Sequence, residues 1–320
     1  MPSSLDIMSG GIQFIQRRCN HKMSPFGTSG VKRWIPFFWI VPPVLMFLAF
    51  SLYPSVFTGY FSLTSYSGLP GTPATFIGLE NYRQAFSLGG WIALAPDIEY
   101  TLIFAVAVTI VQNVAGMLLA LALNKKVRGV SAYRLMIFFP QVLSIVVIGM
   151  IWTLIFSPIG GPMEPVWHLL FGHDSAFLGS YALARWLVIF VQAWNFTGFT
   201  MLIYLSGLQA VPVELEEAAT VDGAGTWKKF WRITWPLLAS SATVNIFLSV
   251  IGALGDYGMI YVLTDGGFGT TTLGMAMFND SFNGGSQFGY GAMLQMLQFG
   301  LTVLLGTVLL WYMRRREVQL

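Results

Sequence analysis

The chain has 320 residues, of which 55% are hydrophobic and only 10% charged, and its mean hydropathy is +0.66. A soluble domain carries about 25% charged residues, so the composition excludes an ordinary water-soluble domain and predicts a membrane protein. The net charge is +3, but the basic residues lie in short clusters between apolar runs, which argues against a nucleic-acid-binding face. Cys19 is the only cysteine, which excludes an internal disulfide and a multi-cysteine metal site.

Residues 1–33 are polar and basic, without an apolar core followed by a small-residue cleavage site, and predict an uncleaved cytoplasmic tail. A membrane-spanning helix needs about 20 apolar residues. The following runs have this length and predict an all-α membrane domain, 34–313, with six transmembrane helices: 34–58, 100–123, 135–156, 186–208, 236–255 and 290–313. Residues 314–320 form a second predicted tail.

Lysine and arginine accumulate in cytoplasmic segments, and their positions therefore predict the orientation. With the amino terminus inside, 15 of the 17 basic residues fall on the cytoplasmic side, in 1–33, 124–134, 209–235 and 314–316. Arg83 and Arg185 are the exceptions. Both tails and the 209–235 segment are thus predicted to face the cytoplasm. Inside the spans, Pro42, Pro43, Pro54 and Pro140 are expected to interrupt or kink helices. The glycines expected to permit close helix contact are Gly116, Gly149, Gly198 and Gly252.

The longest inner segment, 209–235, is amphipathic and predicts two short helices. Pro212 and the acidic residues after it suit the start of the first, and Gly223 and Gly225 suit its end. Lys228, Lys229 and Arg232 fall in the second helix, and Pro236 restarts the chain at the membrane surface.

This segment contains Glu217-Ala218-Ala219, then Asp222-Gly223-Ala224, and then Ile233-Thr234-Trp235-Pro236. The pattern and its spacing resemble the EAA signature of permease subunits of ABC importers, with Trp235 where leucine is usual. The similarity extends from about residue 34 onward, through segments such as 78–82 and 261–267. It points to the carbohydrate-uptake branch, which includes maltose and glycerol 3-phosphate permeases.

The resemblance implies a type I importer fold in a bacterial or archaeal cytoplasmic membrane and alternating access coupled to a separate ATPase. The first short helix would be the coupling helix that docks on this ATPase. The residues expected to take part are Glu217, Ala218, Ala219, Asp222, Gly223, Ala224, Ile233 and Pro236. It also implies two ATPase copies that bind ATP and magnesium, a second homologous permease and an external solute-binding protein. This chain itself would hold no cofactor.

Polar side chains inside apolar spans need a partner or a water-lined cavity. A sugar site needs amides for the hydroxyls and aromatic faces for the C–H surfaces. Gln192, Asn195 and Phe199 share one face of the fourth span, and in the family the segment before the EAA loop lines the pathway. The predicted pathway residues are Gln141, Ser144, Gln192, Asn195, Phe199, Asp256 and Tyr257. Hydrogen bonding between neighbouring helices is the alternative role for each amide.

The sequence lacks the phosphate loop GxxxxGK[ST], the zinc motif HExxH, a CxxC pair and a GxSxG elbow. An ATP-driven mechanism therefore needs a partner chain, and an intramembrane enzyme is disfavoured. An ion-coupled secondary transporter is the nearer alternative, although it would carry paired broken helices in two related halves. An oligosaccharide, a monosaccharide, a polyol and glycerol 3-phosphate all remain open as substrates, and the permease pair could be a hetero- or a homodimer.

Overall fold

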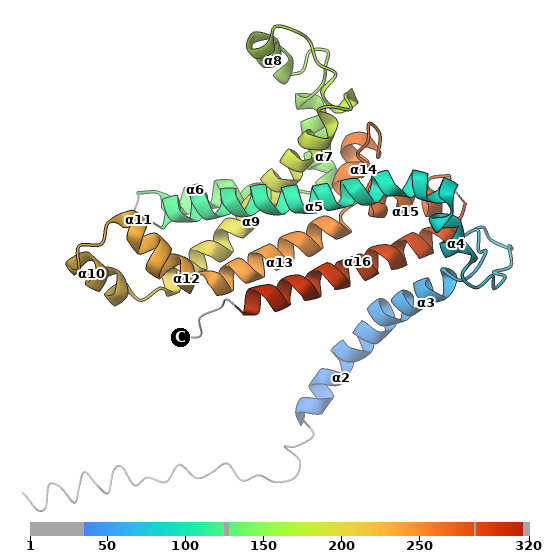
Figure 1. The fold of residues 1–320 in the computed structure, drawn as a ribbon, viewed down its shortest axis with the longest axis horizontal. Helices are drawn as coiled ribbons and strands as arrows, with labels where there is room; N and C mark the ends of the chain where they lie inside the picture. The colour runs from blue at the N-terminus through green and yellow to red at the C-terminus, as the bar shows by residue number, and fades with distance from the viewer. Residues whose placement is uncertain (1–34, 125–127, 285, 316–320) are drawn as a thin grey trace, which may run out of the picture. The chain divides into compact units, whose positions relative to one another are not determined.

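The computed structural model describes residues 35–124, 128–284 and 286–315. Apart from one isolated β-bridge between Thr64 and Phe76, the regular structure of these residues is helical, which confirms the all-α prediction for them (Figure 1). The predicted tail 1–33 lies outside the described residues, as do Lys125, Lys126 and Arg316. The chain divides into two compact units, 1–56 and 57–320, which are described separately.

The described part of the first unit is apolar helix. It comprises α2 (Ile35–Phe47), a π-helical stretch η2 (Leu48–Leu52) and the first residues of α3 (Tyr53–Phe61). Pro42 and Pro43 lie inside α2 and cannot donate backbone hydrogen bonds, which is consistent with irregular helix nearby. Trp39–Phe61 is continuous and apolar enough to cross a membrane.

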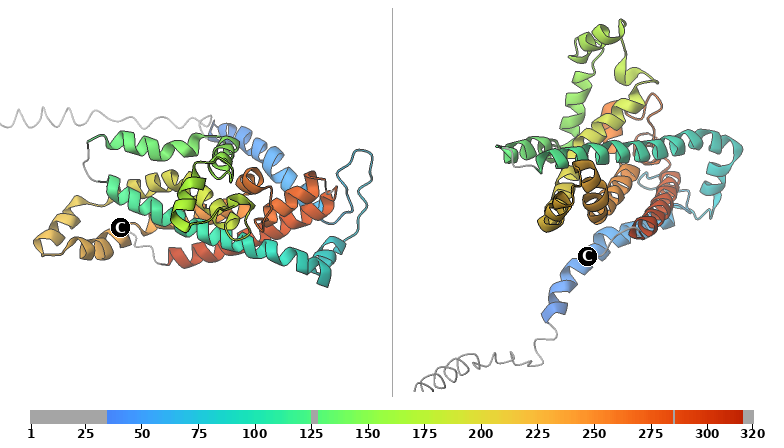
Figure 2. Two further views of the ribbon diagram at one scale, coloured as in Figure 1. Left: turned by 90° about the horizontal axis from the view of Figure 1, so that it is seen from above. Right: turned by 60° about the vertical axis from the view of Figure 1, so that its left-hand side comes forward.

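Three long helices form the centre of the second unit. In Figures 1 and 2, α5 (Leu88–Leu123), α9 (Ala184–Ala210) and α13 (Ala239–Gly255) run side by side. A fourth, α16 (Phe288–Arg314), packs against α13 and α15 (Leu273–Phe282). Their apolar core includes the fully buried side chains of Tyr100, Phe104, Val188, Leu254 and Met259. Burial of these rings and aliphatic groups holds the bundle together through close packing.

The third predicted span, 135–156, is not one straight helix. It consists of α6 (Val130–Phe138), the 3-10 turn η3 (Phe139–Val142) and α7 (Ile145–Ile155), with a bend of 99°. Pro140 lies in η3 and cannot donate a backbone hydrogen bond, and Leu143 and Ser144 are extended. The helix therefore ends here and restarts in a new direction.

The fifth predicted span also contains a bend. The helical stretch formed by α11 (Thr226–Lys229), the π-helical η5 (Phe230–Thr234) and α12 (Trp235–Leu237) meets α13 at 67°. Among the described residues, four helices are long and apolar enough to cross a membrane, and six spans result when each bent pair is counted as one.

The two ends of the second unit carry different elements. One end holds α10 (Val213–Val221), α11, α12, the start of α6 and the end of α16, whereas α4 (Glu80–Phe86), α14 (Gly258–Thr264) and α15 lie toward the other (Figure 1). The short helices α8 (Met163–Phe171) and η4 (Phe177–Gly179) connect α7 to α9. Lys228, Lys229 and Arg314 belong to elements of the first end, and Glu80 and Asp280 to elements of the second.

Glycines allow three of the helix contacts. A Cβ on Gly198 would lie 2.3 Å from the carbonyl oxygen of Ile137, so α9 could not approach α6 as closely with any other residue. A Cβ on Gly116 would lie 2.6 Å from Cγ2 of Thr200, and a Cβ on Gly149 would lie 2.2 Å from Cγ1 of Val262. The prediction is wrong for Gly252, because a Cβ there would meet no atom within 4 Å.

Candidate substrate cavity and coupling loop

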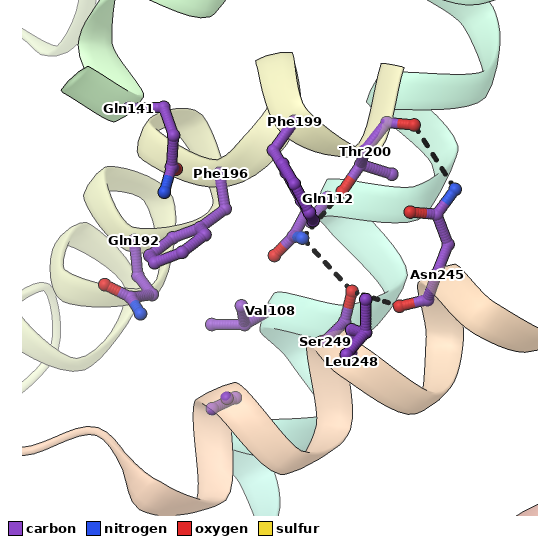
Figure 3. A pocket seen from close by; sticks show the side chains of 12 residues that line it. Val108, Gln112, Gln141, Gln192, Phe196, Phe199, Thr200, Asn245, Leu248 and Ser249 are labelled. Atoms are coloured by element: carbon purple, nitrogen blue, oxygen red, sulfur yellow. Dashed lines mark hydrogen bonds between the residues drawn. The ribbon is translucent and has the colours of Figure 1, made fainter. Parts of the chain in front are cut away.

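A cavity of about 240 Å³ lies between α5, α9, α13 and η3 (Figure 3). Amides, hydroxyls, phenyl rings and aliphatic groups line it: Val108, Gln112, Gln141, Gln192, Phe196, Phe199, Thr200, Asn245, Leu248, Ser249, Gly252 and Ala253. Four separate helical elements contribute, so the cavity depends on the packing of the bundle rather than on one segment.

On one side of the cavity the polar groups bind one another across three helices. The side-chain amide of Gln112 donates to the hydroxyl oxygens of Thr200 at 2.7 Å and Ser249 at 3.1 Å (Figure 3). The amide of Asn245 donates to the carbonyl oxygen of Thr200 at 3.2 Å, and the hydroxyl of Ser249 donates to the carbonyl oxygen of Asn245 at 2.8 Å. These groups therefore join α5, α9 and α13.

The same network continues away from the cavity through Asn113. Its side-chain amide donates to Ser249 Oγ at 3.0 Å, and its oxygen accepts from the hydroxyl of Tyr204 at 2.9 Å. Buried hydrogen bonds of this kind specify which helix faces meet, because leaving any member unpaired is costly.

On the other side of the cavity, two amide oxygens have no hydrogen-bond partner among the described residues. The side-chain oxygens of Gln141 and Gln192 are buried and make no hydrogen bond within the described part of the chain. Gln192 is only 3% exposed. A buried polar atom left without a partner needs an explanation, and a solute or water in the cavity could supply the missing donor.

The structure brings together three of the predicted pathway residues. Gln141, Gln192 and Phe199 line the cavity. Asn195 is buried beside them on α9 but does not line it, and Ser144 is exposed at the cap of α7.

Asp256 and Tyr257 also lie outside the cavity, between α13 and α14. Oδ1 of Asp256 accepts from the backbone N–H of Gly258, the first residue of α14, at 3.1 Å. Burial raises the pKa of Asp256 to about 6, and hydrogen bonds from the backbone of Gly258 and Met259 oppose this shift. The ring of Tyr257 stacks on Phe278 at 5.3 Å.

Several lining residues were not among the predicted ones. Gln192, Phe196 and Thr200 are spaced by four positions and therefore share one face of α9. This spacing is visible in the sequence. Gln112, Asn245 and Ser249 come from α5 and α13. They could be found as polar residues in apolar runs, but the sequence does not show which of them face the same space.

The predicted coupling segment forms two short helices, as expected from its residue pattern. Pro212 precedes α10, and Gly223 ends it with φ of +74°. The N–H of Ala224 donates to the carbonyl oxygen of Ala219 at 2.9 Å, and that of Gly223 to Thr220 at 3.0 Å. This pair of bonds is a Schellman motif, which requires a left-handed residue where glycine stands.

The α10 helix exposes most of its surface. Glu217, Ala218, Asp222 and Gly223 are exposed, whereas Ala219 is buried within the chain. The side chain of Ala219 therefore packs inward. Ala224, Ile233 and Pro236 are half-buried.

Two contacts of α11 and its continuation hold this end of the unit together. The Lys229 ammonium donates to Thr220 Oγ1 at 3.0 Å and joins α11 to α10. Trp231 packs against Trp227 and Trp235, with ring centroids 5.7 and 5.8 Å apart. Tryptophans are enriched where a protein meets the membrane surface.

Among the described residues, no three His, Cys, Asp or Glu side chains group to hold a metal ion.

Comparison with known proteins identifies the family to which the chain belongs. Residues 112–316 match the family of binding-protein-dependent transport system inner membrane components. The match covers both the cavity segments α9 and α13 and the coupling segment. The chain belongs to this family, and it is a multi-pass inner-membrane permease subunit of ABC importers rather than an enzyme.

Individual relatives cover most of the chain. It is 30% identical to the multiple sugar-binding transport system permease protein MsmF of Streptococcus mutans, over 84% of this chain and 91% of the relative. It is 30% identical to the sn-glycerol-3-phosphate transport system permease protein UgpA of Agrobacterium fabrum, over 84% and 92%. The trehalose/maltose transport system permease protein MalF of Thermococcus litoralis is 29% identical, over 82% and 88%.

Solved structures establish the fold. A chain of a bacterial ABC transporter involved in the import of the acidic polysaccharide alginate has a TM-score of 0.75, with 20% identity, over 89% of this chain and 97% of that one. The same kind of transporter in complex with an alginate pentasaccharide-bound periplasmic protein has a TM-score of 0.68, with 19% identity. The fold is thus that of type I ABC importer permeases, as predicted.

Proposed function

We propose that this chain is one permease half of an ATP-driven importer for a sugar or sugar-like solute, which is delivered by an extracytoplasmic binding protein. The exposed α10 helix carries the proposal, because its ordered EAA segment is stabilised within the chain yet leaves Glu217 and Ala218 free to meet another protein. The names of the sugar-transport relatives support the solute class.

In this proposal α10 docks on a cytoplasmic ATPase. The exposed carboxylates of Glu217 and Asp222 are available for charge-assisted hydrogen bonds. Val213 and Val221 add exposed apolar surface at 62% and 88%. The ATP and magnesium belong to two copies of this ATPase, and a second homologous permease completes the pathway.

The cavity is the proposed solute pathway of this half. Gln192 and Gln141 offer amide groups to sugar hydroxyls, and Phe196 and Phe199 offer rings to the C–H faces of a sugar. Movement of the docked α10 helices toward each other would open and close access to it from the two sides of the membrane.

Site-specific cross-linking tests the docking. In a Cys19→Ser background, Val221→Cys on α10 is compared with Leu169→Cys on α8, since the two side chains are exposed to 88% and 85%. A bifunctional reagent on Val221→Cys should capture the ATPase subunit in the purified transporter. Leu169→Cys should not. Equal capture from both positions, or capture only from Leu169→Cys, would overturn the proposal.

A further inference from the structure

No ionisable side chain lines the cavity among the residues that the structure describes. Its twelve lining residues are apolar or carry neutral amides and hydroxyls. Along the chain, Asp256 is the only Asp, Glu, Lys, Arg or His within four positions of a lining residue. It follows the lining residue Ala253 by three positions.

The hydrogen-bonding groups that remain free favour hydroxyls. Gln112, Thr200, Asn245 and Ser249 already bind one another, whereas the side-chain oxygens of Gln141 and Gln192 have no donor within the described residues. An amide oxygen only accepts. A solute hydroxyl can donate to this oxygen and also accept from the NH2 group of the same amide, whereas an ionised phosphate or carboxylate could only accept from the NH2 and would leave the oxygen without a donor.

An anion would also enter this cavity without compensation for its charge. Removing a charge from water is costly unless an opposite charge or several donors replace the water. Proteins that bind phosphates or carboxylates supply arginine, lysine or a helix N-terminus for this purpose. Here the ionisable residue nearest along the chain to the lining positions is the acid Asp256, whose charge has the same sign as the anion.

We propose that the cavity accepts an electrically neutral, hydroxyl-rich solute and excludes phosphorylated and acidic ones. The inference rests on the proposed import function. The family alone does not decide the charge, because the relatives include a sn-glycerol-3-phosphate permease as well as multiple-sugar and trehalose/maltose permeases.

Competitive uptake tests the inference on the complete transporter. Proteoliposomes with the binding protein and ATP receive a mixture of neutral mono-, di- and trisaccharides and polyols, each paired with a charged counterpart. Maltose with maltobionate and glycerol with sn-glycerol 3-phosphate are two such pairs. Mass spectrometry then measures ATP-dependent accumulation.

We expect the neutral member of a pair to accumulate at least about 10-fold more than its charged counterpart, equivalent to about 1.4 kcal/mol. Equal or greater accumulation of a charged member overturns the inference and leaves the proposed import function standing. Accumulation of no member of the panel contradicts the proposed function, and the inference falls with it.

Two substitutions test the contribution of the permease to selectivity apart from that of the binding protein. The same binding protein is used with both variants, so it cannot cause a difference between them. Gln192→Glu and Gln192→Arg introduce opposite charges at one lining position. For a neutral solute both should reduce uptake by at least about 10-fold, within about 3-fold of each other. If Gln192→Arg retained uptake while Gln192→Glu lost it, the solute would be an anion and the inference wrong. If a Gln192 variant does not co-purify with the ATPase, the experiment is repeated with Gln141→Glu and Gln141→Arg.

Discussion

Two kinds of buried amide face the cavity, and their hydrogen bonds separate their roles. Gln112 donates to Thr200 on α9 and to Ser249 on α13, so it joins helices. The side-chain oxygen of Gln192 is equally buried but makes no hydrogen bond within the described residues. We infer that Gln112 contributes mainly to stability and that Gln192 contributes mainly to transport.

Alanine substitution should therefore affect the two glutamines differently. Gln192→Ala removes a buried acceptor without a partner, so the Tm of the purified complex should hardly change while uptake falls by about 10-fold or more. Gln112→Ala leaves two hydroxyl groups with fewer partners and should destabilise the fold by about 1–3 kcal/mol. Thermal unfolding and proteoliposome uptake measure both. A normal uptake rate with a lowered Tm in Gln192→Ala would contradict this assignment.

The sequence indicated which residues are polar inside apolar runs but not which of them are paired. Gln112 is 88 residues from Thr200 and 137 from Ser249 along the chain. Contacts over such distances depend on how the helices pack. By contrast, the capping of α10 by Gly223 uses residues within one turn, and the sequence was sufficient to predict it.

The pH dependence of stability should reveal the buried carboxyl of Asp256. Because its pKa is raised to about 6, the folded state holds a proton that the unfolded chain has released, and stability is lost as the pH rises from about 4 to about 6. Asp256→Asn keeps the acceptor for Gly258 and removes this cost, which is at most about 3 kcal/mol.

The variant should therefore unfold at a higher temperature than the wild type at pH 8. The difference should shrink to about half at pH 5, where the folded carboxyl of the wild type is mostly protonated. Thermal unfolding of both proteins at the two pH values measures it. A difference of equal size at both would mean that the charge of Asp256 is not the cause.

At the scale of the elements, apolar composition predicted helices but not their directions. Residues 135–156 carry no charged side chain and were predicted as one span, yet the chain turns by 99° between η3 and α7. Pro140 marks the region, but neither of the extended residues Leu143 and Ser144 is a proline or glycine that would indicate where the helix restarts. The bend places Gln141 beside α9, so the cavity depends on the direction of a kink whose position, but not direction, the sequence predicted.

The end of α10 gives a matched pair of glycines. Gly223 has φ of +74°, whereas Gly225 is extended with φ of −65°, and a Cβ on either would meet nothing within 4 Å. Gly223→Ala should strain the left-handed position by about 1–2 kcal/mol and reduce substrate-stimulated ATPase activity. Gly225→Ala should behave as wild type. Equal ATPase activities for the two variants would mean that coupling does not depend on the left-handed turn at Gly223.

For the whole molecule, the distribution of charge agrees with the proposed orientation. The elements at one end of the second unit carry Lys228, Lys229 and Arg314, and those at the other carry Glu80 and Asp280. The two basic residues that do not follow the pattern are ion-paired: Arg83 lies 3.7 Å from Glu80, and Arg185 lies 3.7 Å from Glu99. Pairing with a carboxylate reduces the net charge that these two segments carry.

Labelling of intact membranes tests this orientation directly. In the Cys19→Ser background, a membrane-impermeant maleimide should label Val221→Cys only in inside-out vesicles, because α10 is proposed to face the cytoplasm. Leu169→Cys on α8 should be labelled only from the opposite side. Labelling of Val221→Cys from outside intact cells would reverse the orientation and remove the proposed contact with an ATPase.

The length of α5 has a mechanical consequence. Its 36 residues extend about 54 Å, well beyond the roughly 30 Å of the hydrocarbon core. Toward its start, Thr101 Oγ1 accepts from the N–H of Leu273 at 2.9 Å, and at its end the carbonyl oxygen of Leu123 accepts from Arg134 at 3.0 Å. Pro96 lies before Thr101, so the stretch of α5 from Thr101 to Leu123 contains no proline and connects the first turn of α15 with α6. A tilt at one of these two contacts would therefore reach the other through continuous helix.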